Sequence, residues 1–257
     1  MTREKRARSI AKTGEIIKGL AFMVMKTDDI IAASRNTYAS QQSLDNWSGK
    51  KYIDEGLNQT ELRLLTDLPQ KQGKLLLLGG GGGREAIPLA RAGFSVTCVD
   101  FVPSMIEKTL AHAKEAGVKI RCQMQDISQL DVPNESYDVA WFSTALYSCI
   151  PTRKRRIQML QRIHQALRPG GCCVCQFYFN EGEEKKDHKW LRRMTALLTN
   201  GYKEFEPGDE MIWGWIGFRH EFCSAEILKE EFQAASFDVL GLNLDKSTGE
   251  ALLKKTS

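Results

Sequence analysis

Short apolar runs recur along the chain from Lys74 onward, and helix-like stretches lie between them. A short continuous apolar run is typical of a strand that is buried on both faces. The expected strands are 75–78, 95–99, 118–123, 137–142, 172–179, 237–244 and 250–254. The expected helices are 84–91, 104–116, 152–167 and 224–235. This alternation predicts an α/β fold with a doubly wound, mostly parallel sheet and an antiparallel last strand.

Residues 1–60 do not share this rhythm. The segment from Arg3 to Arg8 contains four basic residues, these two arginines included, and the segment 16–25 is largely apolar. We expect an N-terminal helical cap, beginning with a basic amphipathic helix that packs on the main domain. Two other interpretations stay open, namely a lid over an active site and a weak contact of residues 1–25 with a membrane surface.

Residues 61–257 are expected to form the main domain, with an insertion at 180–222 that is rich in charged and aromatic residues. The hydrophobic share of 42% supports a sizeable core, and the net charge of +4 gives no argument for a nucleic-acid partner. No apolar stretch is long enough to span a bilayer. Seven cysteines without disulfide-scaffold spacing predict a reducing, cytoplasmic location.

The most informative segment is Leu75–Leu78, followed by the five glycines Gly79–Gly83. Glycines let the backbone approach a ligand closely, and the helix that follows directs unpaired N–H groups toward it. Asp100 and Asp126 come at the ends of the next two expected strands, where ligands bind in doubly wound sheets. Together these residues predict a nucleoside site.

Five segments of the chain, in their order and spacing, resemble the class I S-adenosylmethionine-dependent methyltransferases. The matching segments are Leu75–Arg84, Val96–Met105, Gln125–Ile127, Tyr137–Trp141 and Leu167–Gly171. They cover about residues 74–180, and Phe222–Leu244 resembles the family's last helix and strand. The resemblance implies a Rossmann-like fold with S-adenosylmethionine as cofactor.

The resemblance also implies roles for residues at the strand ends. Gly79, Gly81 and Gly83 would pass close to the methionine part of the cofactor. Asp100 would bind the ribose hydroxyl groups.

The resemblance also implies which residues would lie near the adenine and the sulfonium of the cofactor. Phe101 and Met105 would flank the adenine. Asp126 would accept a hydrogen bond from the adenine amino group, with the backbone of Ile127 nearby. Ser143 would lie near the sulfonium.

One position departs from the family's pattern. The family commonly carries an acid two residues before the first glycine, where this chain has Leu77. Glu85, Asn46 and Tyr38 are candidates to take over the cofactor's amino end. Alternatively, cofactor binding is weakened, and the chain is a non-catalytic relative.

Few side chains are needed to carry out methyl transfer, because the enzyme mainly aligns the acceptor and excludes water. His220 is the candidate general base, with a structural histidine as the alternative. No metal site is expected, because Cys172, Cys173 and Cys175 alternate faces on one strand. Aromatic residues that are expected to line a substrate pocket or pack in the core are Tyr147, Tyr178, Phe179, Trp213 and Trp215.

The function predicted from these observations is methyl transfer to a small-molecule acceptor, by in-line attack on the sulfonium methyl. The alternative is a protein or RNA methyltransferase that docks through Arg153–Arg156. Residues 1–60 are expected to close over the strand ends. Residues placed to face the pocket are Tyr38, Asn46, Trp47 and Tyr52.

Overall fold

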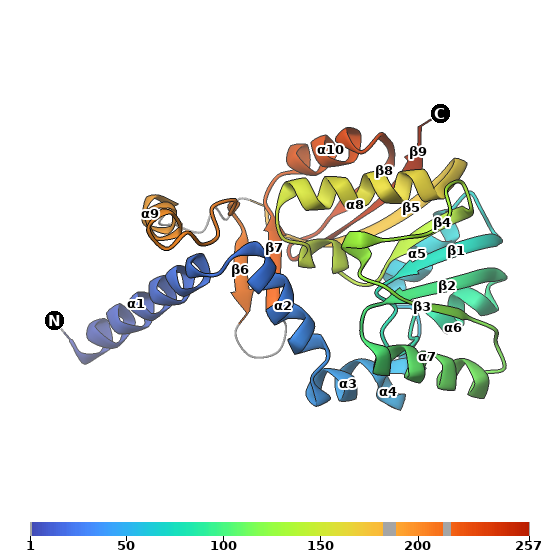
Figure 1. Cartoon of the computed structure of the whole chain (residues 1–257), viewed down its shortest axis with the longest axis horizontal. Helices are drawn as coiled ribbons and strands as arrows, with labels where there is room; N and C mark the ends of the chain where they lie inside the picture. Colours follow the sequence, from blue (N-terminus) through green and yellow to red (C-terminus); the bar gives the residue numbers. More distant parts are fainter. Residues whose placement is uncertain (1, 182–188, 213–216, 257) are drawn as a thin grey trace.

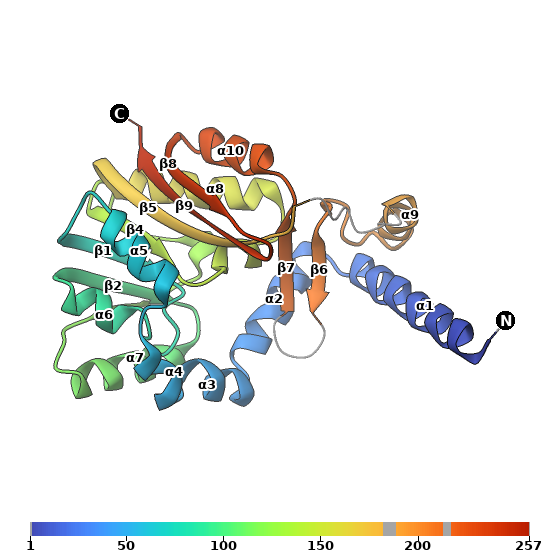
Figure 2. The same cartoon turned by 180° about the vertical axis from the view of Figure 1, so that it is seen from behind.

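The computed structural model describes residues 2–181, 189–212 and 217–256. Its body is a twisted sheet with helices on both faces, and a smaller helical part projects from one side (Figure 1; Figure 2, the view from behind).

Five parallel strands form the centre of the sheet in the order β3-β2-β1-β4-β5. These strands are β1 (Gly73–Leu78), β2 (Phe94–Asp100), β3 (Arg121–Met124), β4 (Tyr137–Phe142) and β5 (Leu167–Phe179). Two antiparallel strands extend it, because β9 (Thr248–Lys255) lies between β5 and β8 (Phe237–Leu244). The predicted doubly wound sheet with an antiparallel last strand is confirmed.

The leucines of β1 show why the sheet is buried on both faces. Leu76 and Leu78 join one apolar cluster, which includes residues of α8 (Arg153–Ala166) and α10 (Ala225–Ala234). Leu75 and Leu77 join another, with residues of α5 and α6. The remaining helices of the body are α5 (Gln59–Asp67), α6 (Ala86–Arg91), α7 (Pro103–Glu115) and the short 3-10 helices η1 (Ile127–Gln129) and η2 (Leu146–Cys149).

The start of β5 differs from the sequence expectation. Residues 168–171 were expected to end a helix and precede the strand, but they already belong to β5. The helix does end at Ala166. The register between β4 and β5 shifts at this point, and Gly170 has a φ of +75°. This irregular pairing accommodates a proline and two glycines within a strand.

The N-terminal residues form four helices, α1 (Arg3–Val24), α2 (Thr27–Tyr38), α3 (Gln41–Ser48) and α4 (Lys50–Glu55). We expected the first helix to pack on the main domain. Its contacts lie in the insertion of that domain, on α9 (Lys189–Thr199) and β6 (Asp209–Ile212), and α1 points away from the sheet (Figures 1 and 2).

A small third apolar cluster holds this projecting part together. It joins Phe22 of α1 and Ile30 of α2 to Tyr202 and to Phe218 of β7 (Gly217–Phe222). The strand β7 pairs with β6 in antiparallel orientation, and its last residues pair in parallel with the end of β5. Within the predicted insertion 180–222, the described residues thus form an antiparallel pair of strands and a helix, attached to the edge of the body. Trp213 and Trp215 lie outside the described residues.

Candidate functional site

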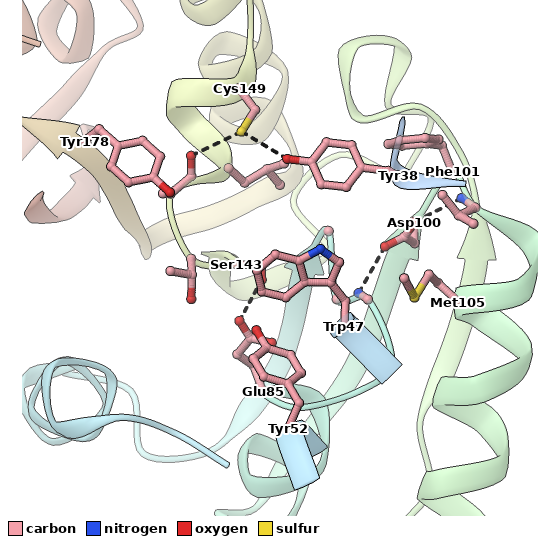
Figure 3. A pocket seen from close by; sticks show the side chains of 17 residues that line it. Tyr38, Trp47, Tyr52, Glu85, Asp100, Phe101, Met105, Ser143, Cys149 and Tyr178 are labelled. Carbon is pink, nitrogen blue, oxygen red and sulfur yellow. Dashed lines mark hydrogen bonds between the residues drawn. The ribbon is translucent and has the colours of Figure 1, made fainter. Parts of the chain in front are cut away.

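A cavity with an empty volume of about 1090 Å³, its open mouth included, lies at the carboxyl ends of β1, β2 and β4. This is the position at which doubly wound sheets bind ligands. Figure 3 shows that its side chains converge from α2, α3, α4 and β5, among other elements. The lining residues are Tyr38, Trp47, Tyr52, Gly79, Gly80, Gly81, Glu85, Asp100, Phe101, Val102, Met105, Ser143, Thr144, Ala145, Leu146, Cys149 and Tyr178.

The glycine loop forms the floor of the cavity, and its geometry explains its composition. Gly81 has a φ of +51°, in the left-handed region that favours glycine. Gly80 has no room for a side chain, because an added Cβ would collide with the Sγ atom of Cys98 beneath it. The loop thus brings bare backbone to the surface of the cavity.

Asp100, at the end of β2, lines the cavity and is only 7% exposed. Its Oδ2 atom accepts a hydrogen bond from the backbone N–H of Gly81 at 3.0 Å, and its Oδ1 atom accepts one from Val102 at 2.9 Å. Burial raises the pKa of this carboxyl group above its ordinary value. Phe101 and Met105 lie beside it in Figure 3.

A buried ionic cluster lies at the opposite wall. Glu85 accepts hydrogen bonds from Ser143 Oγ and from Arg84 Nη2, both at 2.6 Å. Arg84 also binds Glu61 through two of its nitrogens, at 2.6 and 2.7 Å. Glu85 is 2% exposed, and burial raises the pKa of its carboxyl group. Arg84 and Glu61 hold Glu85 in place, while Glu85 itself lines the cavity.

The third region of the lining is aromatic and uncharged. The hydroxyl group of Tyr38 lies 3.5 Å from Cys149 Sγ, and Tyr178 faces the same space (Figure 3). Burial raises the pKa of the Cys149 thiol and that of Tyr178. The guanidinium of Arg219 lies 4.8 Å from the ring centre of Tyr178. At ordinary pH this end therefore offers neutral hydroxyl and thiol groups beside apolar walls.

The structure brings together most of the cofactor-site residues predicted from the sequence. Gly79, Gly81, Asp100, Phe101, Met105 and Ser143 all line the cavity. Of the residues predicted to close over it, Tyr38, Trp47 and Tyr52 line it as well, whereas Asn46 does not.

Gly83, Asp126 and Ile127 do not line the cavity. Asp126 forms an ion pair with Arg35 of α2, and its Oδ1 atom accepts a hydrogen bond from the backbone N–H of Ser128 at 2.9 Å. Its expected contact with an adenine amino group stays a prediction, to which this ion pair gives no support.

His220 also lies outside the lining. It is buried on β7, and its Nδ1 atom lies 2.7 Å from Oδ1 of Asp209. Asp209 is further held by the hydroxyl group of Tyr202, at 3.1 Å. This placement favours the structural alternative, because a general base has to reach the acceptor.

Two of the aromatic residues that were expected to line a pocket or pack in the core also lie outside the cavity lining. Tyr147 and Phe179 are buried in the core beside α8 and α10.

Among the described residues there is no group of three His, Cys, Asp or Glu side chains that could hold a metal ion. Within the same residues, no helix is long and apolar enough to cross a bilayer.

Sequence reasoning missed Cys149, Thr144 and Leu146. They follow β4, where Ala145 has a φ of +55° and turns the chain back over the cavity. Alanine rarely adopts a positive φ, so the sequence gives no signal for this turn.

Comparison with known proteins relates this site to others. Residues 75–171 match the family described as "Methyltransferase domain". The ubiquinone biosynthesis O-methyltransferase of Rickettsia conorii is 47% identical over 66 residues, which are 26% of this chain and 22% of that protein. The tRNA 5-carboxymethoxyuridine methyltransferase of Escherichia coli is 31% identical over 126 residues, 47% of this chain and 46% of that protein. The matches thus span less than half the length of these curated relatives.

Solved structures share the fold over more of the chain. A methyltransferase from Methanosarcina mazei, described as SAM-dependent, superposes with a TM-score of 0.60 at 20% identity, covering 78% of this chain and 98% of that one. The 1,6-didemethyltoxoflavin-N1-methyltransferase of Burkholderia thailandensis, solved with S-adenosylhomocysteine, gives 0.59 at 18% identity, covering 90% and 87%.

Proposed function

Because the chain belongs to the class I S-adenosylmethionine-dependent methyltransferases, we propose that it transfers a methyl group from this cofactor to a small molecule bound in the cavity. The observation that carries the proposal is the layout of that cavity. One space connects the glycine loop and Asp100 to an uncharged end formed by Tyr38, Cys149 and Tyr178. A donor and an acceptor can therefore meet inside it.

The residues present fit the cofactor. Asp100 directs a carboxylate into the cavity, where it can accept hydrogen bonds from ribose hydroxyl groups in addition to its two backbone N–H donors. Phe101 and Met105 provide apolar surface for the adenine. The bare backbone at Gly79 and Gly81 allows the close approach that the methionine part requires.

Glu85 fits the position of the missing acid. Leu77 is fully buried in the sheet and cannot reach a ligand. Glu85 lies in the cavity wall instead, held by Ser143 and Arg84. We therefore assign the cofactor's ammonium group to Glu85. Arg84 is shared between the carboxylates of Glu85 and Glu61, so an ammonium group would balance the negative charge that remains in this buried cluster.

When bound, the sulfonium supplies an electrophilic methyl group. The chain's contribution is then to align the acceptor and to exclude water. Asp100 and Glu85 are the charged side chains among the described lining residues, and both are assigned to the cofactor. What remains at the Tyr38 and Tyr178 end favours an uncharged acceptor of small size.

The alternative of an RNA or protein acceptor relied on Arg153–Arg156. In the structure, Arg153 pairs with Glu230, Arg155 with Asp28 and Arg156 with Glu231. These pairs leave little unpaired positive charge for a docking patch. We accordingly place the small-molecule acceptor first.

Calorimetry with S-adenosylmethionine, followed by transfer of labelled methyl groups to fractionated metabolites or to tRNA, tests the proposal. Asp100→Asn should lower cofactor affinity about tenfold to 100-fold, since a charge-assisted bond to ribose contributes about 1.5–3 kcal/mol. The exposed Asp131→Asn is the matched control and should bind normally. Normal affinity in folded Asp100→Asn contradicts the site. Cofactor binding without transfer to any acceptor indicates a non-catalytic relative, and transfer to tRNA alone refutes the small-molecule acceptor.

A further inference from the structure

The first helix, α1, projects from the body of the molecule, and little of its surface is covered. Residues 2–13 are all exposed, although α1 continues as one helix of 22 residues to Val24 (Figures 1 and 2). Helices in proteins owe most of their stability to an apolar face that packs on something else. The first half of α1 has no such packing within the described part of the chain.

An apolar or small residue recurs on α1 at alternating intervals of three and four, which is the spacing of a helix–helix seam. The large members of this stripe are Ile10, Ile17 and Val24, which are 74%, 60% and 52% exposed. The small members, alternating with them, are Ala7, Gly14 and Ala21.

The contact with α9 does not cover this stripe. A Cβ added at Gly19 would lie 3.0 Å from Arg192 of α9, so α9 packs against that side of α1. Gly19 is two residues beyond Ile17, which is about 200° around a helix. The stripe therefore faces away from α9.

The alternation of small and large residues fits a second copy of the same helix. In an antiparallel pair of helices related by a two-fold axis, residue i faces residue j and j faces i, so facing numbers have a constant sum. In an antiparallel pair with a sum of 31, Gly14 faces Ile17. The same register pairs Ala7 with Val24 and Ile10 with Ala21. Every layer then holds one large and one small residue.

The charges at the ends of this pairing are also complementary. An antiparallel pair places the basic start of each α1, which holds Arg3, Lys5, Arg6 and Arg8, beside the carboxyl end of the other α1, where the helix dipole is negative. Asp28, on α2 a few residues beyond that end, is 89% exposed even with Arg155 of its own chain beside it. We propose that two copies of this chain associate through α1, packed antiparallel along this stripe.

Analytical ultracentrifugation of the full chain over a wide concentration range tests the proposal. We expect a monomer–dimer equilibrium in which Ile17→Glu raises the dissociation constant about 100-fold or more, because the new carboxylate would be buried opposite Gly14. Ser9→Glu is the matched control. Ser9 is exposed and lies off the stripe, so the Ser9→Glu variant should dimerise with the dissociation constant of the wild type.

An exchange of the small and the large residue tests the register itself. A side chain at Gly14 meets nothing within 4 Å in one copy, so Gly14→Ile disturbs only the pair. Gly14→Ile alone and Ile17→Gly alone should each weaken association. The double variant restores one large and one small residue in that layer, and association should recover.

Two results overturn the proposal. One is a chain that stays monomeric at every concentration. The other is a stripe that binds vesicles of anionic phospholipid, loses this binding in Ile17→Glu and shows no self-association, which would assign it to a membrane surface.

Discussion

At the scale of single residues, the composition of the glycine loop depends on the atoms beneath it. Gly80 contacts the side of β2, where the thiol of Cys98 fills the space that a side chain would need. The packing of the sheet therefore requires a glycine at the second position of the loop.

Gly80→Ala should lower the free energy of unfolding by about 1–3 kcal/mol, because the added methyl group overpacks a closed space. Urea unfolding measures this loss. Gly241→Ala is the control, since a Cβ there meets nothing within 4 Å. Adding Cys98→Ala to Gly80→Ala should recover part of the loss, and no recovery would mean that the thiol is not the obstacle.

The affinity for S-adenosylmethionine should depend on pH through Glu85. Burial raises the pKa of Glu85 in the free protein, whereas an adjacent ammonium group would lower it again. Binding then releases a proton, and affinity falls as the pH drops through the raised pKa, which lies above the ordinary value of about 4.3.

Calorimetry over a pH series, comparing the wild type with Glu85→Gln, separates this effect from others. Asp100 also has a raised pKa and adds its own loss of affinity in acid. The variant keeps the contribution of Asp100 and lacks that of Glu85. Identical pH profiles for the two proteins would remove Glu85 from the ammonium site.

At the scale of elements, two helices on the same face of the sheet are joined by a buried ion pair. Arg156 of α8 donates to Glu231 of α10 at 2.7 and 3.0 Å, and both side chains are fully buried. The hydroxyl group of Tyr147 donates to the same carboxylate at 2.5 Å. Removing one partner would leave a buried charge uncompensated.

Arg156→Met should lower the free energy of unfolding by about 3–5 kcal/mol for this reason. Denaturant unfolding provides the measurement. The double variant Arg156→Met and Glu231→Leu should lose less than the single one, because neither charge remains. Arg155→Met, whose partner Asp28 is exposed, should change stability by about 1 kcal/mol or less.

Removing residues 1–36 should reduce turnover far more than it reduces the stability of the sheet. This truncation deletes most of α2, whose Ser34 accepts a hydrogen bond from the backbone N–H of Phe218 at 3.2 Å and whose Ile30 is fully buried. Tyr38, the residue of α2 that lines the cavity, stays in the chain but loses the rest of its helix, while the strands from Gly73 onward remain.

Removing only residues 1–13 is the control, since all that are described among them are exposed. Methyl-transfer rates and thermal unfolding of both truncated chains give the comparison. Full activity after removal of residues 1–36 would show that α2 has no part in the site.

At the scale of the whole molecule, the cavity joins helices near the start of the chain to strand ends far along it. Adding S-adenosylmethionine should therefore slow amide hydrogen exchange in α2 and α3, which carry Tyr38 and Trp47. The first half of α1 should not change. Exchange monitored by mass spectrometry tests this, and unchanged exchange in α2 and α3 would contradict a closing role.

The sheet could be predicted because each buried parallel strand has its own local signature. The run Leu75–Leu78 is apolar throughout, since both faces of β1 are covered. The direction of α1 and the pairing of β7 with β5 could not be predicted in this way. Both depend on contacts between distant segments, such as Phe22 with Phe218, which leave no periodic pattern.

The residues of the candidate site likewise fall into those that a local sequence pattern predicts and those that it does not. Asp100 was found because it ends a strand, and strand ends meet at one edge of the sheet. Ser143 was assigned through the family resemblance alone. Cys149 was missed because it reaches the cavity through an unusual backbone turn at Ala145. His220 looked chemically suitable, yet its strand directs it toward Asp209 instead.

The strand order also has a consequence for how this protein is made. β9 lies between β5 and β8 although it follows both in the chain. While a ribosome is still adding residues 180–247, most of β5 waits with an unpaired edge of backbone N–H and C=O groups. Cysteines and aromatic residues from Cys172 to Phe177 lie along that edge. The nascent chain thus exposes an aggregation-prone edge between the synthesis of β5 and that of β9, and the pairing of β9 with β5 ends that exposure.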